Sequence, residues 1–399
     1  MKKNIIALLF AFTVINMFGQ APAVSKASKP IDSNTKVLAP NEIVTNKAIS
    51  PLVKVQLDEN SILIYDYDGS LFSFSLDTED FNWTVKATDA YTEMSANKIT
   101  LKDGVIYVPF INGEIFAIDN QSGDVFWKSR LGDSKDQTIL KDQTLTINGG
   151  KLYVTSQNGN IYALNIKDGS LAWSYKLDSL NNDVPILFFD NKVFTQSGTS
   201  FYSFDANTGK VLSQKTFDLA MHSKAVTDGE NVFIANEKNE LFALSPNKFD
   251  VLWQFKFDEN QFNIKEKIFS KDKKIYFATQ GTTASSVYAI DSKTGAQIWK
   301  IDFAGDNIDY ITENEDTLWG YTHKGKLFQL DLTTGASLFE TKLTTLPISN
   351  LEFPDDESLF YYCDAGLIQI EIKTKDENVM YMRNTIKDDV YSAYIKIIR

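Results

Sequence analysis

Cysteine and histidine are the scarcest reactive residues in this sequence, and their scarcity excludes several kinds of site. The 399 residues contain one cysteine, Cys363, so no disulfide can form within the chain. We interpret it as a small buried hydrophobe in the run FYYC, and pairing between two molecules is the alternative. His222 and His323 are widely separated, and a zinc site would need at least two more ligands. We therefore expect no metal site and no Ser–His–Asp triad, for which the G-x-S-x-G elbow is also missing.

A surplus of positive charge is also missing. The 52 acidic residues outnumber the 40 basic residues, which gives a net charge of −12. Such a protein repels nucleic-acid phosphates. We therefore expect no nucleic acid among the partners.

Long apolar runs are absent, apart from one near the start. Lys2 and Lys3 precede an apolar stretch of 11 residues, 5–15, and the small residue Gly19 follows. This order is typical of a signal peptide, which we place at residues 1–19. The stretch is shorter than the roughly 17 residues that a membrane-spanning helix needs, so an uncleaved anchor is the less favoured alternative. We expect the mature protein to be periplasmic or secreted, with no direct membrane insertion.

Residues 20–50 form a second region with few large apolar residues. They are rich in Ser, Lys, Pro, Asn and Ala, and such a composition predicts a flexible lead-in. Within this region, residues 41–47 are the segment that could add a strand to the folded domain. Residues 51–399 then form a single domain.

Aromatic residues are abundant, and they recur at a regular interval. There are 28 Phe, 17 Tyr and 6 Trp, residue types that favour strands. One short motif returns every 40 to 46 residues: GSLFSFS from Gly69, GEIFAID from Gly113, GNIYALN from Gly159, TSFYSFD from Thr199, NELFALS from Asn239, SSVYAID from Ser285, GKLFQLD from Gly325 and a weaker copy, GLIQIEI, from Gly366.

A second marker lies 11 residues after the aromatic residue of each copy. Five of the six tryptophans occupy it, namely Trp83, Trp127, Trp173, Trp253 and Trp299, and the other copies have Ser213, Phe339 and Met380. Glycine precedes this position by four residues in five copies, at Gly123, Gly169, Gly209, Gly295 and Gly335.

The repeat of about 42 residues predicts the fold. Alternating apolar and polar runs separated by short turns indicate four antiparallel strands in each copy. Eight such units predict an all-β protein, an eight-bladed β-propeller of four-stranded antiparallel blades. Seven blades would result if the eighth copy only closed the ring. The tail at residues 390–398 also has the pattern of a strand, which would complete the ring with an N-terminal strand.

The consensus of an aromatic residue, Ala, an apolar residue and Asp, followed by Thr-Gly and Trp, resembles the PQQ-like repeat of eight-bladed propellers. The clearest copy is YAIDSKTGAQIW, and the resemblance covers about 330 residues. It indicates the fold more than the function. By resemblance, the structural blade-docking residues are Trp83, Trp127, Trp173, Trp253 and Trp299.

Two branches of that family imply different functions. Quinoprotein dehydrogenases bind pyrroloquinoline quinone over a disulfide between adjacent cysteines, with calcium and a catalytic Asp; the single cysteine here excludes that disulfide. BamB-like propellers are non-enzymatic subunits of the outer-membrane β-barrel assembly machine, and the length and the predicted export resemble this branch. The missing lipid-accepting cysteine after the signal peptide is a departure from it.

Three further features have structural interpretations. Asp66, Asp68 and Gly69 resemble the start of a calcium loop, but the twelfth position is Asp77 and not the usual Glu, so we predict a hairpin turn. The run PDDE at residues 354–357 reads as a solvated turn. Trp319 lies off the repeat position, where packing between blades is favoured over contact with a ligand near the hub.

Our leading hypothesis is a non-enzymatic, exported scaffold that binds a protein partner through loops on one propeller face, with a role in outer-membrane protein assembly. The longer connections at residues 130–144 and 280–286 are the expected contact surface. A quinone-dependent oxidoreductase working in the central channel and a secreted carbohydrate- or ligand-binding propeller are the alternatives. We expect no cofactor, and the oligomeric state stays open.

Overall fold

The computed structural model describes residues 60–66, 69–88, 97–132, 139–179, 184–262, 264, 266–382 and 393–398. The predicted signal peptide, the lead-in and the strand proposed at residues 41–47 lie outside these residues. The described part contains 33 strands and no helix, so it offers no helix that is long and apolar enough to cross a membrane.

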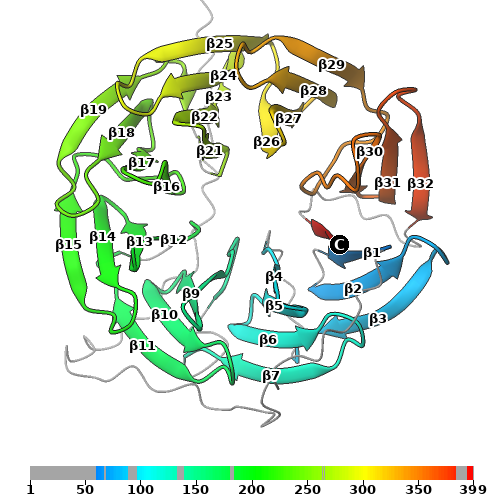
Figure 1. The fold of residues 1–399 in the computed structure, drawn as a ribbon, viewed down its shortest axis with the longest axis horizontal. Coiled ribbons are helices and arrows are strands. Elements are labelled where there is room, and N and C mark those ends of the chain that lie inside the picture. Colours follow the sequence, from blue (N-terminus) through cyan, green and yellow to red (C-terminus); the bar gives the residue numbers. More distant parts are fainter. Residues whose placement is uncertain are drawn as a thin grey trace, which may run out of the picture. The chain divides into compact units, whose positions relative to one another are not determined.

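Apart from one separate two-stranded sheet, the strands form eight sheets arranged in a ring, which confirms the predicted eight-bladed β-propeller (Figure 1). Each sheet is a blade whose strands run in order from the central channel to the rim. We number the blades in ring order, beginning with the blade that contains the first strand. All pairings within the blades are antiparallel, as predicted.

Blades 1 to 4 are built mainly from the first half of the chain, with their strands in order from the channel outward. Blade 1 contains β33 (Tyr394–Ile398), β1 (Ser61–Tyr65), β2 (Ser70–Ser75) and β3 (Asp80–Lys86). Blade 2 contains β4 (Thr100–Lys102), β5 (Val105–Pro109), β6 (Glu114–Asp119) and β7 (Val125–Arg130). Blade 3 contains β8 (Thr146–Asn148), β9 (Lys151–Ser156), β10 (Asn160–Asn165) and β11 (Leu171–Lys176). Blade 4 contains β12 (Leu187–Phe189), β13 (Lys192–Ser197), β14 (Ser200–Asp205) and β15 (Val211–Thr216).

The second half of the chain gives the other four blades. Blade 5 contains β16 (Val226–Thr227), β17 (Val232–Ala235), β18 (Glu240–Leu244) and β19 (Val251–Lys256). Blade 6 contains β21 (Ile268–Lys271), β22 (Lys274–Ala278), β24 (Ala284–Asp291) and β25 (Gln297–Ala304), and a separate two-stranded sheet of β20 (Gln261–Phe262) and β23 (Gln280–Gly281) adjoins it. Blade 7 contains β26 (Ile308–Asn314), β27 (Thr317–Thr322), β28 (Lys326–Asp331) and β29 (Ser337–Lys342). Blade 8 contains β30 (Ser358–Cys363), β31 (Gly366–Glu371) and β32 (Glu377–Met382), and its inner position is filled by a segment with two isolated bridges, Pro347 to Cys363 and Glu352 to Phe360.

The ring is closed by the C-terminal strand, as the pattern of the tail predicted. All five residues of β33 pair with β1, so blade 1 is built from both ends of the described chain. Two side chains of blade 8 hold the same strand. Asn350 accepts a hydrogen bond from the Ile395 N–H (2.9 Å) and donates one to the Ile395 carbonyl (2.9 Å). Glu352 accepts hydrogen bonds from the Lys396 ammonium (3.1 Å) and the Ile397 N–H (3.2 Å).

The core lies between the blades. The second and third strands of a blade are buried on both faces, as in β5 and β6, because a neighbouring blade covers each face. The fourth strand alternates exposed and half-buried residues, as in β19, since only one side is covered. The apolar clusters accordingly join neighbouring blades, and the cluster around Trp299, Phe303 and Phe328 joins blades 6 and 7.

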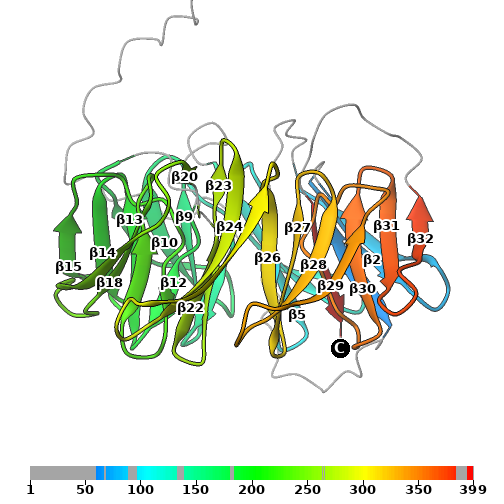
Figure 2. The same ribbon diagram turned by 90° about the horizontal axis from the view of Figure 1, so that it is seen from above.

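The propeller has two faces that differ in their loops (Figure 2). The turn face carries the turns that join the two inner strands and the two outer strands of each blade. The connector face carries the turns between the two middle strands and the connections from one blade to the next. This division follows from strands that alternate in direction across every blade.

Candidate functional site

The five repeat-position tryptophans contact the following blade in the same way. Each indole N–H donates a hydrogen bond to a backbone carbonyl in the turn between the third and fourth strands of the next blade, with N···O distances of 2.9 to 3.1 Å. The pairs are Trp83 with Asn120, Trp127 with Ile166, Trp173 with Ala206, Trp253 with Ser292 and Trp299 with Leu332. These contacts are the structural basis of the blade-docking role that the resemblance implies. How much the tryptophans stabilise the ring stays a prediction.

Glycine in the receiving turn makes room for each indole. At Gly169, φ is +71°, and an added Cβ would lie 2.5 Å from Cε3 of Trp127. The same close approach occurs at the turn glycines Gly123, Gly209, Gly295 and Gly335, facing Trp83, Trp173, Trp253 and Trp299. The repeat therefore couples Trp in one copy to Gly in the next, because a side chain at this position would collide with the ring.

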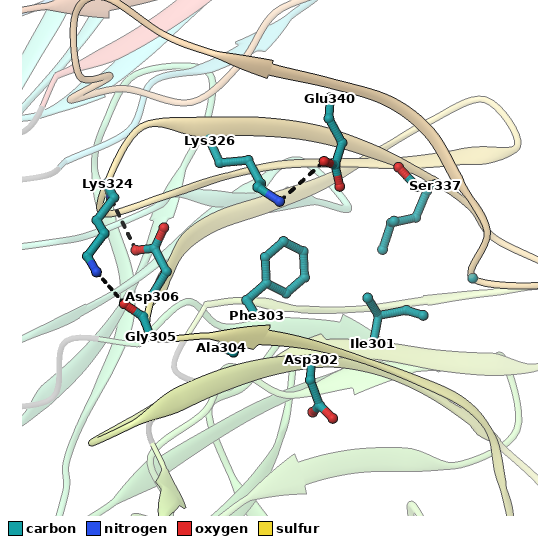
Figure 3. A pocket seen from close by; sticks show the side chains of 12 residues that line it. Ile301, Asp302, Phe303, Ala304, Gly305, Asp306, Lys324, Lys326, Ser337 and Glu340 are labelled. Atoms are coloured by element: carbon teal, nitrogen blue, oxygen red, sulfur yellow. Dashed lines mark hydrogen bonds and ion pairs between the residues drawn. The ribbon is translucent and has the colours of Figure 1, made fainter.

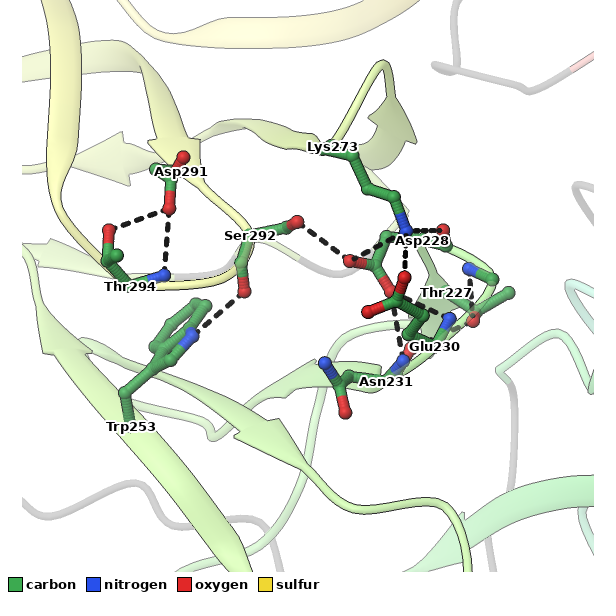
Figure 4. Close-up of polar contacts among 10 residues, drawn as sticks. Thr227, Asp228, Glu230, Asn231, Trp253, Lys273, Asp291, Ser292 and Thr294 are labelled. Atoms are coloured by element: carbon green, nitrogen blue, oxygen red, sulfur yellow. Dashed lines mark hydrogen bonds and ion pairs between the residues drawn. The ribbon is translucent and has the colours of Figure 1, made fainter.

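The junction between blades 5 and 6 has a polar network on the turn face (Figure 4). Ser292 accepts a hydrogen bond from Trp253 through its carbonyl and donates one from its hydroxyl to Asp228 of blade 5 (2.7 Å). Lys273 donates to the Asp228 carbonyl and pairs with Glu230 at 3.0 Å. Burial raises the pKa of Asp228, but hydrogen bonds from the Asn231 N–H and Ser292 outweigh it, and the pKa is lowered overall.

Blade 8 departs from the repeat, and the alignment at Met380 is wrong. The turn hydrogen bonds place Glu371 where the other blades have the aspartate of their third strand, one residue earlier than the sequence alignment. The bulge in the pairing of β31 with β32 also moves, so that Met380 has no partner across the strand pair. Tyr381 instead reaches blade 1, with ring centroids 5.0 Å from Phe81 and 5.7 Å from Phe74.

The connector face presents two exposed apolar side chains outside the outer strands. Phe262 is 42% exposed and Leu346 is 51% exposed; the other large apolar residues of comparable exposure in the described chain belong to outer strands at the rim. Leu346 packs over the loop that contains Gly325, where an added Cβ would lie 2.8 Å from a Leu346 methyl carbon. Together with the cavity between blades 6 and 7, these side chains define what we call the blade 6–8 patch.

A buried amide positions Phe262. Its neighbour Gln261 donates a hydrogen bond to Ser286 (2.6 Å) and accepts hydrogen bonds from Thr279 (2.8 Å) and Tyr288 (3.0 Å). The backbone pairing of β20 with β23 fixes the same segment. The Phe262 ring therefore stands on an anchored two-stranded sheet and not on an unsupported loop.

The cavity of the patch has a volume of about 300 Å³ and lies between blades 6 and 7 (Figure 3). Phe303, Ile301 and Leu330 supply its apolar lining, and Phe303 packs against Phe328 with ring centroids 4.6 Å apart. Lys324 and Lys326 line one side. The volume is at the lower end for ligand sites, sufficient for one side chain or a small molecule.

The mouth of the central channel contains a second group of polar residues. Lys98 of blade 2 forms an ion pair with Glu266, which precedes the inner strand of blade 6 on the opposite side of the ring (Figure 1). Burial lowers the pKa of Lys224 to about 8, with a smaller contribution in the same direction from the nearby Lys98. Burial raises the pKa of the Tyr310 and Tyr394 hydroxyls well above the ordinary value. These groups make the channel mouth polar and crowded with protein charges.

The residues that the sequence assigned to ordinary structure lie in ordinary places. Cys363 is fully buried in β30, as predicted. His222 and His323 are in different blades, and the His323 ring is 3.2 Å from Asp309. Within the described ranges no three His, Cys, Asp or Glu side chains gather as metal ligands. Trp319 is buried in β27 and packs against Phe353 of blade 8, with ring centroids 5.4 Å apart, which agrees with the packing interpretation.

The two predicted turns are also seen. Asp66 and Gly69 close the hairpin between β1 and β2 through the hydrogen bond from the Gly69 N–H to the Asp66 carbonyl (3.0 Å), and Asp68 lies outside the described residues. In the PDDE run, the Asp355 carboxylate accepts hydrogen bonds from the Glu357 and Ser358 N–H groups, which makes a tight turn.

Both connections expected to bind a partner belong to the connector face. Residues 130–144 are described only in part and connect blades 2 and 3, whereas residues 280–286 form β23 and the start of β24. The sequence did not single out Phe262, Leu346, Lys324 or Lys326. The sequence indicated that Phe303 faces the next blade, because it continues the alternation of apolar residues that begins at Trp299. The cavity beside Phe303 is formed by the neighbouring blade, and the alternation does not indicate it.

Comparison with known proteins relates this propeller to one protein family. The family model described as outer membrane protein assembly factor BamB matches the chain over residues 38–255, 197–353 and 283–376. A search of curated proteins finds no match.

Solved structures share the fold at low sequence identity. BamB from Moraxella catarrhalis is 15% identical with a TM-score of 0.60, covering 79% of this chain and 94% of that one. The dihydro-heme d1 dehydrogenase NirN, in complex with DHE, is 12% identical with a TM-score of 0.65, covering 84% and 77%. Quinohemoprotein alcohol dehydrogenase from Comamonas testosteroni is 10% identical with a TM-score of 0.63, covering 77% and 70%. The three overlapping matches of the family model span most of the repeat, and the chain therefore belongs to the family of the outer membrane protein assembly factor BamB.

Proposed function

We propose that the protein is a non-enzymatic, extracytoplasmic scaffold that binds another protein through its connector face, with a role in outer-membrane protein assembly. The family supports this function, since its description names an assembly factor. The single observation that carries the choice of face is the exposure of Phe262 and Leu346 beside a cavity, since the other large apolar side chains of comparable exposure in the described ranges belong to outer strands. Exposed apolar groups that cluster with a cavity mark interaction sites.

The non-enzymatic part of the proposal is supported by the channel and by the cysteine count. Lys98 and Glu266 pair across the channel, where an oxidoreductase of this fold would be expected to work. The single cysteine excludes the disulfide of the quinoprotein branch. Incubation with pyrroloquinoline quinone and calcium should leave the absorption spectrum and the melting temperature unchanged. A new absorption band with a raised melting temperature would favour the oxidoreductase.

Affinity purification from the native cell envelope, with mild crosslinking and mass spectrometry, tests the scaffold function. The protein should recover a reproducible partner, and outer-membrane assembly components among the captured proteins would identify the pathway. The double variant Phe262→Asp with Leu346→Asp should lose that partner, because two charges replace its apolar contacts.

A matched control for these variants is Leu212→Asp. Leu212 is 46% exposed, comparable to Phe262, but it lies on the outer strand of blade 4. This variant should retain the partner. Failure to enrich any protein, or equal recovery by all variants, would argue against binding through the connector face.

A further inference from the structure

The sequence contains three Asn–Gly dipeptides, which begin at Asn112, Asn148 and Asn158. Such a pair is chemically labile, because glycine has no side chain to hinder the approach of its main-chain nitrogen to the preceding side-chain amide. The reaction needs two free groups, the amide of the asparagine and the N–H of the glycine. The hydrogen bonds of the folded protein therefore decide which of the three pairs can react.

The pair that begins at Asn112 is held at both groups. The Gly113 N–H donates a hydrogen bond to the Phe110 carbonyl (3.0 Å). The Asn112 side chain is fully buried, and its amide donates to the Glu114 carboxylate (2.9 Å). Neither the nitrogen nor the amide is free, so this pair should be protected.

The pair that begins at Asn158 is held in the same way. The Gly159 N–H donates a hydrogen bond to the Ser156 carbonyl (2.9 Å). The Asn158 side-chain oxygen accepts a hydrogen bond from the hydroxyl of the same serine. This pair should also be protected, because a rotation of the amide toward the glycine nitrogen would break both contacts.

Asn148 differs from the other two asparagines. It is the last residue of β8, and Gly149 and Gly150 form the turn that leads to β9 on the turn face. The Asn148 side chain is exposed, and neither its amide nor the Gly149 N–H forms a hydrogen bond with another described residue. Gly149 has φ of +56°, and an added Cβ at either glycine would meet no atom within 4 Å. The turn is therefore open to water and leaves room for a ring to form.

We propose that Asn148 is a site of spontaneous deamidation, at which the folded protein converts an amide to aspartate and isoaspartate with water as the only co-reactant. The Gly149 nitrogen loses its proton to hydroxide and bonds to Cγ of Asn148. The C–N bond of the side-chain amide then breaks, and ammonia leaves with a proton from water. Water opens the resulting cyclic imide: attack at Cγ gives aspartate, whereas attack at the main-chain carbonyl carbon gives isoaspartate.

The two products differ in what they do to blade 3. Aspartate places a carboxylate opposite Lys151, the cross-strand partner of Asn148, and opposite charges across a strand pair attract. Isoaspartate adds one carbon atom to the main chain beside the two-residue turn, whose length sets the register of β8 and β9. Isoaspartate should therefore disturb the pairing of Asn148 with Lys151, whereas aspartate should keep it.

Incubation of the purified protein at pH 8, followed by peptide mapping with mass spectrometry, tests the proposal. The peptide with Asn148 should gain the mass difference between an acid and an amide at least tenfold faster than the peptides with Asn112 and Asn158. In heavy-oxygen water it should also gain a heavy oxygen atom, which shows that hydrolysis occurred during the incubation. A protease that cleaves before aspartate but not before isoaspartate distinguishes the two products.

The same protein unfolded in urea is the matched control. There all three peptides should react at similar rates, because the hydrogen bonds that protect Asn112 and Asn158 are lost. Asn148→Gln keeps an amide in the turn but requires a larger ring, so it should slow the reaction at least tenfold without a change in melting temperature. Gly149→Ala should also slow it, since a methyl group hinders the nitrogen. An Asn148 that stays intact in the folded protein, or a reaction at Asn158 as fast as that at Asn148, would overturn the proposal.

Discussion

Phe249 takes the place of glycine at the junction between blades 4 and 5, where Ser213 takes the place of tryptophan. The Ser213 hydroxyl donates a hydrogen bond to the Asn247 carbonyl of the receiving turn, one residue beyond the position whose carbonyl accepts from an indole at five other junctions. Phe249 keeps the left-handed backbone of the missing glycine, with φ of +58°, and its fully buried ring packs between Phe194 and Phe201. The Phe249 ring of blade 5 thus compensates for the side-chain volume that is missing at Ser213 of blade 4.

At Phe249, a glycine variant should be more stable than an alanine variant, the reverse of the usual order of stability. Phe249→Ala removes a buried ring and should lower the free energy of unfolding by about 3 kcal/mol. Phe249→Gly removes the same ring but also relieves the left-handed strain, which is worth about 1 kcal/mol. Urea unfolding should therefore show that the glycine variant is the more stable of the two. An alanine variant of equal or higher stability would show that the backbone there relaxes.

Gly169→Ala should destabilise the protein more than Gly149→Ala, although both glycines belong to blade 3. Both have positive φ, so each alanine costs about 1 kcal/mol of backbone strain. Only at Gly169 would the new methyl group collide with Trp127, whereas Gly149 faces open space. We expect a loss of about 3 kcal/mol for Gly169→Ala in urea unfolding, since overpacking adds its own cost to the strain. Equal losses of unfolding free energy at the two positions would argue against a docking role for Trp127.

The fold could be predicted from the sequence because the same local pattern of strands and turns recurs in each of the eight blades. The alternating runs gave the strands, and the tail around Ile395 and Ile397 showed the alternation of a strand that needs a partner. The Trp–Gly coupling was visible as a spacing within one copy, although the contact joins two copies. The receiving partner at each junction became clear only when neighbouring blades were placed side by side.

The candidate site could not be predicted in the same way. Phe262 lies outside the repeat motif, and nothing in its neighbourhood indicates whether a phenylalanine there is covered. Lys98 and Glu266 are 168 residues apart and meet only because the ring brings opposite blades to one channel. Blade 8 misled the alignment, because a one-residue change in its turn shifts the pairing without changing the apolar pattern.

Asn350→Ala should loosen the closing strand before it loosens the rest of the ring. The side chain makes two hydrogen bonds to Ile395, and their loss should lower the free energy of unfolding by about 2 kcal/mol. Amide hydrogen exchange should accelerate at Ile395 and Ile397 while the amides of β17 keep their protection. Acceleration of equal size in every blade would indicate that the strand opens only with global unfolding.

Lys267 should make a contribution to the stability of the protein that increases between pH 8 and pH 10. Its side chain is 8% exposed, and burial lowers the pKa from 10.5 to about 8, against the opposing attraction of Asp309. In this range the unfolded chain binds the proton at Lys267 and the folded protein has released it, so raising the pH favours the folded state.

Lys267→Met tests this pH dependence. A depression of this size corresponds to a gain on the order of 3 kcal/mol across the range, and Lys224 should add a part of its own because its pKa is lowered in the same direction. Urea unfolding at pH 7, 8, 9 and 10 should therefore show that the free energy of unfolding of wild type, relative to that of Lys267→Met, increases with pH. The variant loses the hydrogen bond to the Ile308 carbonyl (2.8 Å), which lowers its stability at all pH values alike and leaves the slope as the diagnostic quantity. Identical slopes for the two proteins would mean that Lys267 titrates at its ordinary value, with its ammonium hydrated in the folded state.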